Sequence, residues 1–292
     1  MVSRNARDGE ITHDVGIHVS ISGKIDLSVD RAIEIGCRGA FQIFTCSPRR
    51  WNASPLDQKE VEAFREKATK NEYRIFAHMP YLPNLSSPDP NFYSESIKVL
   101  TREITRCDDL GVKNLVLHFG SHMNTSIESG KKRIVEACKR SISETKQSKV
   151  RMLLENSADA KSVGARFETI AAVLKELDDD KRTGVCLDTC HAFASGYDLR
   201  TPEAVKTTLE NLDSTIGIRN LYLIHFNDSK GPLGSASDRH EHVGKGEIGL
   251  SGMSAVLNSG LLNNLPVVLE TPSEEGIGKR DIAIVKKLIG SA

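Results

Sequence analysis

A short apolar run meets a carboxylate and an imidazole in the stretch Gly184-Val185-Cys186-Leu187-Asp188-Thr189-Cys190-His191-Ala192-Phe193. Val185 and Leu187 suit a strand that is buried on both faces, as the strands of parallel sheets are. Polar side chains begin at Asp188, where such a strand would leave the sheet, and His191 follows on the expected loop. The stretch therefore predicts a buried strand that delivers metal ligands at its C-terminal end.

Similar units precede and follow this stretch. Short apolar runs, each followed by a polar residue and then by a helical pattern, lie at residues 15–19, 40–44, 74–77, 115–117, 150–154, 184–187, 221–224 and 267–269. The runs lack a clean alternation of polar and apolar residues, which favours parallel strands covered on both faces. Because strand and helix alternate eight times without a break in composition, we expect an α/β fold, a single (β/α)8 TIM barrel with its site at the C-terminal rim of the strands.

Some local features refine this expectation. Ser54 and Pro55 are typical of an N-cap and a first helical position, which predicts a helix that runs to about Lys70. A long loop is expected at residues 227–249. No Gly-rich dinucleotide or phosphate-binding loop follows any expected strand. A doubly wound open sheet remains the structural alternative, because spacing along the chain does not show whether a sheet closes.

Composition limits the classes of partner. Lys plus Arg and Asp plus Glu each number 39 among 292 residues, so the formal net charge at pH 7 is +0. No overall field would draw the protein onto nucleic acid or an anionic membrane, so any DNA contact must use a local patch. No apolar run approaches the ~20 residues that span a bilayer. We expect a soluble cytoplasmic protein with a flexible polar tail at residues 1–13 and one domain at residues 14–292.

The six cysteines show no paired spacing, which favours free thiols in a reducing compartment. Cys186 and Cys190 flank Asp188 closely. Because harder ligands are available nearby, we expect both thiols to be buried structural groups and not metal ligands.

Polar side chains gather at the ends of six expected strands, and a parallel barrel brings all these ends to one rim. The candidates on strands are His78, His118, Glu155, Asp188, His225 and Glu270, and the loops add His191, Asp238 and His240. One such residue alone is more often a structural polar group than a ligand. This many carboxylates and imidazoles at one rim need cations to offset desolvation and repulsion. The mixture suits zinc, with manganese or iron as substitutes, and the number of candidates suits two or three ions.

These residues lie in motifs that resemble endonuclease IV, the metal-dependent apurinic/apyrimidinic endonuclease family, over nearly the whole chain from about Val15. The motifs are His18-Val19-Ser20, Phe44-Thr45 with Arg49 and Trp51, His78 with Tyr81-Leu82 and Asn84, His118 with Gly120-Ser121-His122, Leu154-Glu155-Asn156, Gly184 to Phe193, Gly196-Tyr197-Asp198, His225-Phe226-Asn227-Asp228, Asp238-Arg239-His240 and Leu269-Glu270-Thr271. The resemblance implies a trinuclear zinc site. Its ligand groups would be His78 with His118 and Glu155, then Glu155 with Asp188, His225 and Glu270, and finally His191 with Asp238 and His240.

The resemblance also implies the reaction. The expected activity is DNA repair by hydrolysis of the phosphodiester 5′ to an abasic site in duplex DNA, with cleaning of blocked 3′ ends. The products would be a 3′-hydroxyl and a 5′-deoxyribose phosphate. A metal-activated bridging hydroxide would be the nucleophile, with Glu155 and Glu270 as the catalytic carboxylates. The DNA contacts would come from Arg49, Tyr81, Leu82, Asn84 and Arg239.

Two other functions remain open on the sequence. A TIM-barrel sugar isomerase or epimerase also places Glu, Asp and His around divalent ions, but it needs only about four ligands. A non-catalytic damage-binding protein would keep the barrel without its chemistry, which the filled ligand positions argue against. One long rim on a single domain suits a monomer.

Overall fold

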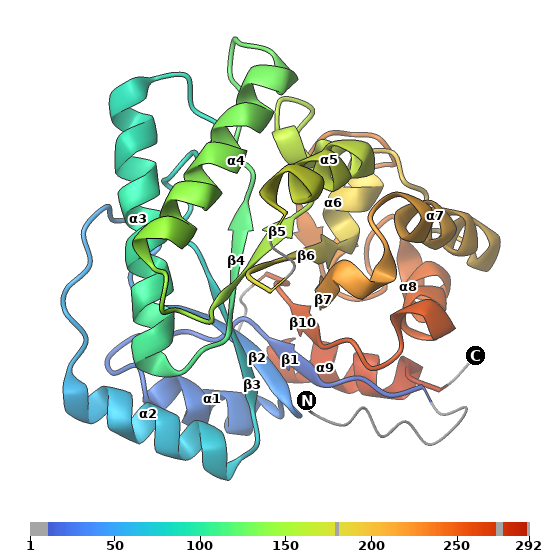
Figure 1. The fold of residues 1–292 in the computed structure, drawn as a ribbon. Helices are drawn as coiled ribbons and strands as arrows, with labels where there is room; N and C mark the ends of the chain where they lie inside the picture. The colour runs from blue at the N-terminus through green and yellow to red at the C-terminus, as the bar shows by residue number, and fades with distance from the viewer. Residues whose placement is uncertain (1–10, 179–180, 273–276, 291–292) are drawn as a thin grey trace.

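The computed structural model describes residues 11–178, 181–272 and 277–290, in which eight parallel strands surround a central axis (Figure 1). The strands are β1 Val15–Ile17, β2 Ala40–Phe44, β3 Arg74–His78, β4 Asn114–His118, β5 Arg151–Glu155, β6 Thr183–Asp188, β7 Leu221–His225 and β10 Val267–Leu269. Their order in the sheet is β1-β10-β7-β6-β5-β4-β3-β2, and each hydrogen-bonded pair is parallel. Apart from β1 and β10, the first and last strands, neighbours in the sheet are therefore neighbours in the chain, as a (β/α)8 barrel requires.

Closure of the sheet joins β1 to β2. His18, just past β1, forms a parallel bridge with Gln42, and the Val19 N–H donates to the Gln42 carbonyl over 2.7 Å. Gly16 permits this close approach, because a Cβ at that position would lie 1.9 Å from the Ala40 carbonyl oxygen. The sheet is a closed barrel, so the expected TIM barrel is confirmed and the open doubly wound sheet is excluded.

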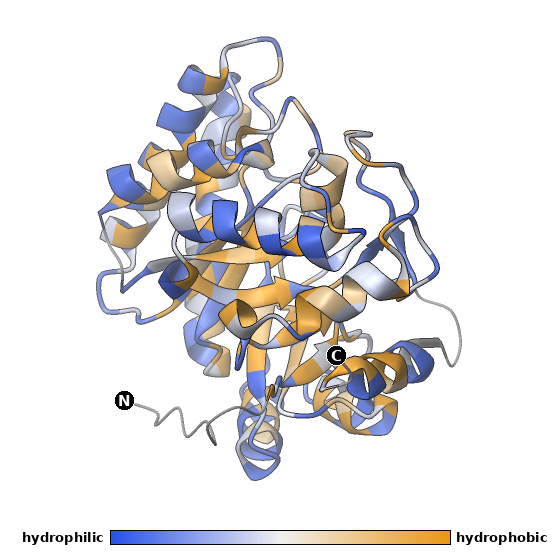
Figure 2. Cartoon of the chain, turned by 90° about the vertical axis from the view of Figure 1, so that its right-hand side faces the viewer, coloured by the Kyte–Doolittle hydropathy of each residue, from blue (hydrophilic) through white to orange (hydrophobic). Residues whose placement is uncertain are grey.

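Helices cover the outside of the barrel (Figure 1). They are α1 Leu27–Ile35, α2 Gln58–Lys70, α3 Pro90–Leu110, α4 Ile127–Glu144, α5 Phe167–Leu177, α6 Thr189–Ala194, α7 Pro202–Thr215, α8 Gly249–Leu257 and α9 Ile277–Leu288. Short 3-10 turns lie at Val163–Ala165, Ile218–Asn220 and Gly260–Leu262. Apolar residues colour the strands and many of the helix faces turned toward them, and polar residues lie outside (Figure 2). The main core, with the fully buried rings of Phe41, Phe64 and Phe167, contains side chains of both layers.

One helix begins later than its sequence suggests. The helix expected from Ser54 begins at Gln58, because Asp57 is its N-cap and accepts two backbone N–H groups of the first turn. The Ser54 carbonyl accepts a hydrogen bond from Arg106 of α3 over 2.8 Å. This tertiary contact holds Ser54 in the segment before the helix, and Asp57 takes the cap position, so the prediction of Ser54 as N-cap was wrong.

Two connections contain structure that was expected to be loop. Asp188 accepts the His191 N–H over 2.7 Å and caps α6, so His191 lies on a helix that directly follows β6. The connection at residues 227–249 contains an antiparallel pair, β8 Asp228–Ser229 and β9 His240–Glu241. The buried Asp228 carboxylate accepts the N–H groups of Gly246 and Ile248, both over 3.0 Å. These bonds fold the connection back over the rim.

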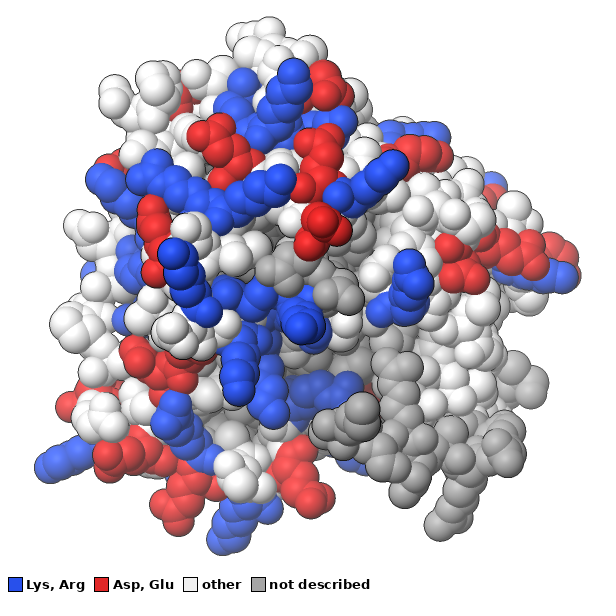
Figure 3. Space-filling model, in the orientation of Figure 1, with Lys and Arg blue, Asp and Glu red and all other residues white. Residues whose placement is uncertain are grey.

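Most of the expected flexible tail, residues 1–10, lies outside the described residues. His13, the last residue of the expected tail, is buried, and its ring nitrogens contact the Leu265 and Leu257 carbonyl oxygens, each over 2.8 Å. No helix within the described ranges is long and apolar enough to cross a bilayer. Acidic and basic side chains are mixed over the upper part of the face in Figure 3, and a group of basic ones lies near its centre. No single-sign field covers this face.

Candidate metal centre

The candidate ligands on the strands lie one layer above the apolar interior of the barrel. A separate apolar cluster takes one residue from each of seven strands, namely Ala40, Phe76, Val116, Leu153, Cys186, Leu223 and Val268. Two positions later stand Gln42, His78, His118, Glu155, Asp188, His225 and Glu270. Alternate residues of a strand point to the same side. These side chains therefore line the inside of the barrel above its apolar layer, which explains why the strand-end candidates meet.

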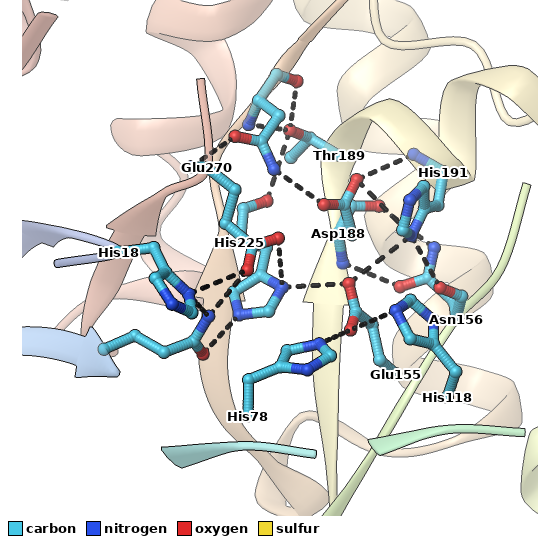
Figure 4. A network of polar contacts seen from close by, with 12 residues as sticks. His18, His78, His118, Glu155, Asn156, Asp188, Thr189, His191, His225 and Glu270 are labelled. Carbon is cyan, nitrogen blue, oxygen red and sulfur yellow. Dashed lines mark hydrogen bonds and ion pairs between the residues drawn. The ribbon is translucent and has the colours of Figure 1, made fainter. Parts of the chain in front are cut away.

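Glu155 lies at the centre of this arrangement (Figure 4). Its Oε2 atom is 3.2 Å from Nε2 of His78 and 3.6 Å from Nε2 of His118. Its Oε1 atom is 2.9 Å from Nδ1 of His225, which also lies 3.2 Å from Oε2 of Glu270. The two oxygens of Glu155 thus face two different sets of imidazoles. This is the geometry that a carboxylate needs to bridge two cations.

A third group lies beside the first two. Oδ1 of Asp238 is 3.0 Å from Nε2 of His191 and 3.2 Å from Nε2 of His240. Asp188 faces Nε2 of His240 over 3.6 Å and is also grouped with Glu155. Within each of the three groups the ligand atoms lie within 4.8 Å of one another. The structure brings all nine candidate ligands together, and Asp188 and His191 fall into different groups.

Four of the five candidate imidazoles are oriented as metal-binding imidazoles are. Nδ1 of His78 contacts the Met79 carbonyl at 2.7 Å, Nδ1 of His191 the Asn156 carbonyl at 2.9 Å, Nδ1 of His240 the Glu270 carbonyl at 3.0 Å, and Nε2 of His225 the Gln42 side-chain oxygen at 2.8 Å. Because an oxygen without a proton only accepts, each of these nitrogens carries a proton, so the other ring nitrogen, once deprotonated, can present its lone pair to a cation in the cluster. Nε2 of His191 and Nε2 of His240 face each other at 3.4 Å. A shared cation satisfies both, so the donor set fits divalent metal.

The mutual charges shift the pKa values of these groups. Burial alone would raise the pKa of Glu155, but the neighbouring imidazoles, His225 foremost, hold it well below its usual value. Burial also disfavours charge on His240, yet Asp188 and Asp238 raise the pKa of this imidazole to about 9. Ionised carboxylates at the centre therefore demand positive charge, which either protons on imidazoles or metal ions supply.

The expected DNA-contact residues lie on loops around this centre. Tyr81 is 61% exposed and Leu82 is 37% exposed, both on the loop after β3. Arg49 is exposed on the loop after β2, and Arg239 is exposed on the connection after β7. The Tyr81 ring packs edge-on against Phe44, with 5.2 Å between the ring centroids. These four side chains are accessible to a ligand that covers the rim.

Asn84 is engaged differently. Its Nδ2 atom donates to the Ser121 carbonyl over 2.9 Å, and its Oδ1 atom accepts the Ser86 N–H over 3.0 Å. The side chain is only partly exposed. Asn84 therefore ties the loop after β3 to the loop after β4.

Comparison with known proteins identifies the family. A family model described as a xylose isomerase-like TIM barrel matches residues 29–288. The chain is 46% identical over 267 residues to the probable endonuclease 4 of Nitrosopumilus maritimus, which covers 89% of this chain and 94% of that protein. The chain belongs to the endonuclease IV family. Another member, the probable endonuclease 4 of Methanoculleus marisnigri, is 42% identical over 280 residues, with 95% of this chain and 99% of that protein covered.

Solved structures agree with membership of the endonuclease IV family. Endonuclease IV from Thermus thermophilus matches with a TM-score of 0.84 and 33% identity, over 96% of this chain and 100% of that chain. A D-tagatose 3-epimerase-like protein matches with a TM-score of 0.70 but only 18% identity, over 94% of this chain and 96% of that chain. Identity this low shows a shared barrel fold and no more.

Gln42 is a buried residue of this endonuclease IV family member that the strand-end pattern missed. Its side-chain oxygen accepts from Nε2 of His225 over 2.8 Å, and its Nε2 atom donates to Oε1 of Glu270 over 2.6 Å. The same nitrogen lies 3.0 Å from Nδ1 of His18. Gln42 stands in mid-strand, because β2 continues to Phe44. Its position two residues after an apolar interior residue, shared with the ligands, is the signal that would have found it.

Replacing Gln42 by leucine is expected to weaken Zn²⁺ binding by about 10- to 100-fold, the range typical of losing a group that orients a metal ligand. Leucine keeps the side-chain volume but leaves Nε2 of His225 and Oε1 of Glu270 without this partner. Competition with a chelating dye measures the affinity. Gln58→Leu, at an exposed position of α2, is the control, and equal affinities for the two variants would show that Gln42 does not orient ligands.

Two asparagines that follow strand-end ligands hold the neighbouring carboxylates. Asn227 donates from Nδ2 to Oδ2 of Asp188 over 2.7 Å and accepts the Glu270 N–H over 2.8 Å. Asn156 accepts the Asp188 N–H over 2.7 Å. Both asparagines are buried. Neutral amides therefore fix the carboxylates without adding charge to the site.

Metal binding is expected to release protons. With a pKa of about 9, His240 carries a proton at neutral pH in the metal-free protein, and a metal ion binds only the deprotonated imidazole. Calorimetric titration with Zn²⁺ in two buffers of different ionisation enthalpy should show release of at least about one proton per chain at pH 7, and less near pH 10. Equal heats in the two buffers at pH 7 would contradict this charge balance.

Proposed function

We propose that the chain is an apurinic/apyrimidinic endonuclease of DNA repair. It hydrolyses the phosphodiester bond 5′ to an abasic site in duplex DNA, leaves a 3′-hydroxyl and a 5′-deoxyribose phosphate, and removes blocking groups from 3′ ends. The observation that carries this proposal is the convergence of nine candidate ligands, in three groups, within a chain of the endonuclease IV family. The names of the relatives, probable endonuclease 4 and endonuclease IV, support cleavage of nucleic acid.

Three zinc ions, or Mn²⁺ or Fe²⁺ in their place, would be held by the three ligand groups. Ions bound there would lower the pKa of a bridging water and neutralise the charge that grows on the phosphodiester and on its leaving oxygen. Glu155 is held ionised, and its two oxygens face the ligand group of His78 and the ligand group of His225. It could therefore accept a proton from the attacking water. Glu270 is fixed from two sides, by the Gln42 amide at its carboxylate and by Asn227 at its N–H.

Lesion selection would come from the exposed rim. A nucleotide without a base stacks poorly, so extruding it costs less free energy than flipping an intact nucleotide. Tyr81 and Leu82 lie three and four residues after His78, so side chains that enter a duplex there would do so next to the metal centre. Arg49 and Arg239 would contact phosphates. Because all nine candidate ligands belong to one chain, we also propose that the monomer is the active unit.

A duplex with one synthetic abasic site tests the proposal. Zinc-loaded protein is expected to cut the damaged strand immediately 5′ to the lesion and to leave the undamaged duplex intact. Extension of the product by a DNA polymerase would demonstrate the 3′-hydroxyl. The proposal fails if no cut appears after zinc is supplied, or if cutting survives both Glu155→Ala and Glu270→Ala.

The metal content separates this function from the sugar isomerase alternative. An isomerase uses about four ligands and one or two ions, which would leave His78, His118, His191 and His240 unexplained. Close to three bound zinc ions per purified chain would favour the nuclease. One or two ions, together with turnover of a ketose, would favour the isomerase. Intact zinc loading with tight lesion binding and no cleavage would favour the non-catalytic damage-binding protein.

A further inference from the structure

The segment Thr45–Ser54, which follows β2, carries three candidates for contact with DNA. Arg49 and Arg50 are exposed, and Trp51 is partly exposed. The segment contains no helix or strand. Ten residues without regular structure usually give a mobile loop, because few of their backbone groups are paired. Contacts that hold this segment in one shape would therefore fix the positions from which its side chains reach DNA.

Two arginines of α3 hold this segment by its backbone. Arg106 donates from Nη1 to the Ser54 carbonyl over 2.8 Å and from Nη2 to the Thr45 carbonyl. Arg102 donates from Nη1 to the Trp51 carbonyl. The two guanidinium groups thus bind the first residue, the last residue and the residue next to the exposed arginines. Hydrogen bonds from a charged donor are about twice as strong as neutral ones.

A buried carboxylate organises the two arginines. Glu103 has no exposed surface, and its Oε1 atom accepts from Nε and Nη2 of Arg102 over 3.1 and 2.9 Å. Its Oε2 atom accepts the Thr45 hydroxyl, whose oxygen in turn accepts from Nε of Arg106 over 3.0 Å. A buried charge is stable only when it is paired and fully hydrogen-bonded, and this one is. The cluster is therefore a rigid link between α3 and the segment.

Trp51 is fixed to α3 at its ring as well as at its carbonyl. Its ring packs perpendicular to that of Phe92, with 5.0 Å between the centroids. Phe92 lies in the first turn of α3, and Arg102 lies ten residues later on the same helix. Helix α3 thus contacts both the ring and the backbone carbonyl of Trp51.

We infer that Arg102, Glu103 and Arg106 are positioning residues that hold Thr45–Ser54 in the shape that presents Arg49, Arg50 and Trp51 to damaged DNA. The inference rests on the proposed function, because it assigns the segment to that substrate. A side chain that enters a duplex must compensate for the base stacking that it disrupts. A mobile loop would lose part of its contact energy to ordering. The buried cluster removes this entropic cost before DNA arrives.

The test uses full-length zinc-loaded protein with Arg102→Met, which removes the bond to the Trp51 carbonyl, and with the charge-compensated double variant Arg102→Met/Glu103→Gln. Arg140→Met is the matched control, because this exposed arginine pairs only with Glu144 on the surface of α4 in the contacts described. Trp51 is the only tryptophan in the chain. Its fluorescence therefore reports on the segment without interference.

Both Arg102 variants are expected to keep the wild-type zinc content and far-ultraviolet circular dichroism. Acrylamide should quench Trp51 about twice as fast, and the KM for an abasic duplex should rise about tenfold with kcat changed less than about twofold, as loss of one charge-assisted bond predicts. Removal of the phosphate from a single-stranded oligonucleotide with a 3′-phosphate, which offers no duplex to enter, should match wild type. Arg140→Met should match wild type in every measurement.

Three results would overturn the inference. They are unchanged quenching and unchanged KM in folded zinc-loaded variants, equal losses on the duplex and the single-stranded substrate, and loss of zinc. Time-resolved fluorescence anisotropy of Trp51 in the unmodified protein is a test that needs no variant: a decay at the rate of overall tumbling supports the inference, and the fast local decay of a free loop overturns it. If wild type does not cut the abasic duplex, the proposed function fails, while quenching and anisotropy still decide whether the cluster holds the segment.

Discussion

Replacing Glu155 by glutamine is expected to lower kcat/KM for cleavage of an abasic duplex by at least about 10³-fold, since both metal binding and proton transfer depend on it. One oxygen of Glu155 faces His78 and His118, and the other faces His225. Glutamine keeps the shape of the side chain but offers a neutral amide with one oxygen, so it cannot serve both ligand groups. Single-turnover cleavage with excess zinc measures the effect.

Glu210→Gln is the control for this prediction, because Glu210 is exposed on α7 and makes only a long surface ion pair, 3.9 Å from Lys206, among the contacts described. It should retain wild-type cleavage and zinc content, because surface ion pairs contribute little to the free energy of unfolding. The zinc content of Glu155→Gln is expected to fall as well. Full zinc loading of this variant, together with cleavage within about tenfold of wild type, would show that neither metal binding nor proton transfer depends on Glu155.

Removing metal with EDTA is expected to abolish cleavage and to lower the melting temperature by about 10 °C or more, because ions that bind only the folded state stabilise it by mass action. Nine candidate ligands lose their common counter-charges at once, and the buried carboxylates Glu155 and Asp188 then depend on protonated imidazoles for neutralisation. Adding zinc back should restore both properties. Cleavage that persists in protein shown by mass spectrometry to hold no metal would contradict the proposed mechanism.

Cys190→Ala tests which atoms hold the metal. The structure allows one further grouping, Asp188 with Cys190 and His240. Burial raises the pKa of the Cys190 thiol far above its ordinary value, which disfavours the thiolate that a metal requires. We therefore expect Cys190→Ala to keep its zinc content and its cleavage rate, in contrast to chelated protein. Loss of one zinc ion per chain in this variant would assign the thiol to the site.

The strand-end ligands could be predicted because their signal is local. A short apolar run marks each strand, and the next polar residue marks its end, as in Leu154-Glu155 and Ile224-His225. Parallel order then brings the ends to one rim without further information. The three ligand groups, by contrast, came from the family resemblance, because spacing along a chain does not tell which strand ends face each other across a barrel.

Features that depend on contacts between distant segments could not be predicted. Ser54 has the sequence of an N-cap, but its carbonyl bonds to Arg106, fifty-two residues later, and the helix begins at Gln58 with Asp57 as its cap. His191 is a different case, because the Asp188 side chain that caps α6 lies only three residues earlier, and an Asp N-cap is a local signal that could have predicted this helix. Only the Ser54 case replaces a local preference with a hydrogen bond whose partner the local pattern does not reveal.

The sequence by itself determined the alternation of eight strands and helices and the residue types at the strand ends, because both depend on hydrophobic periods only a few residues long. Only the tertiary structure decided that Gly16 and Gln42 close the barrel, that Gln42 joins His225 to Glu270, and that α3 holds the segment Thr45–Ser54. These contacts join residues up to 228 positions apart. Their free energies depend on burial and on the mutual orientation of the partners, which exist only once the barrel has closed.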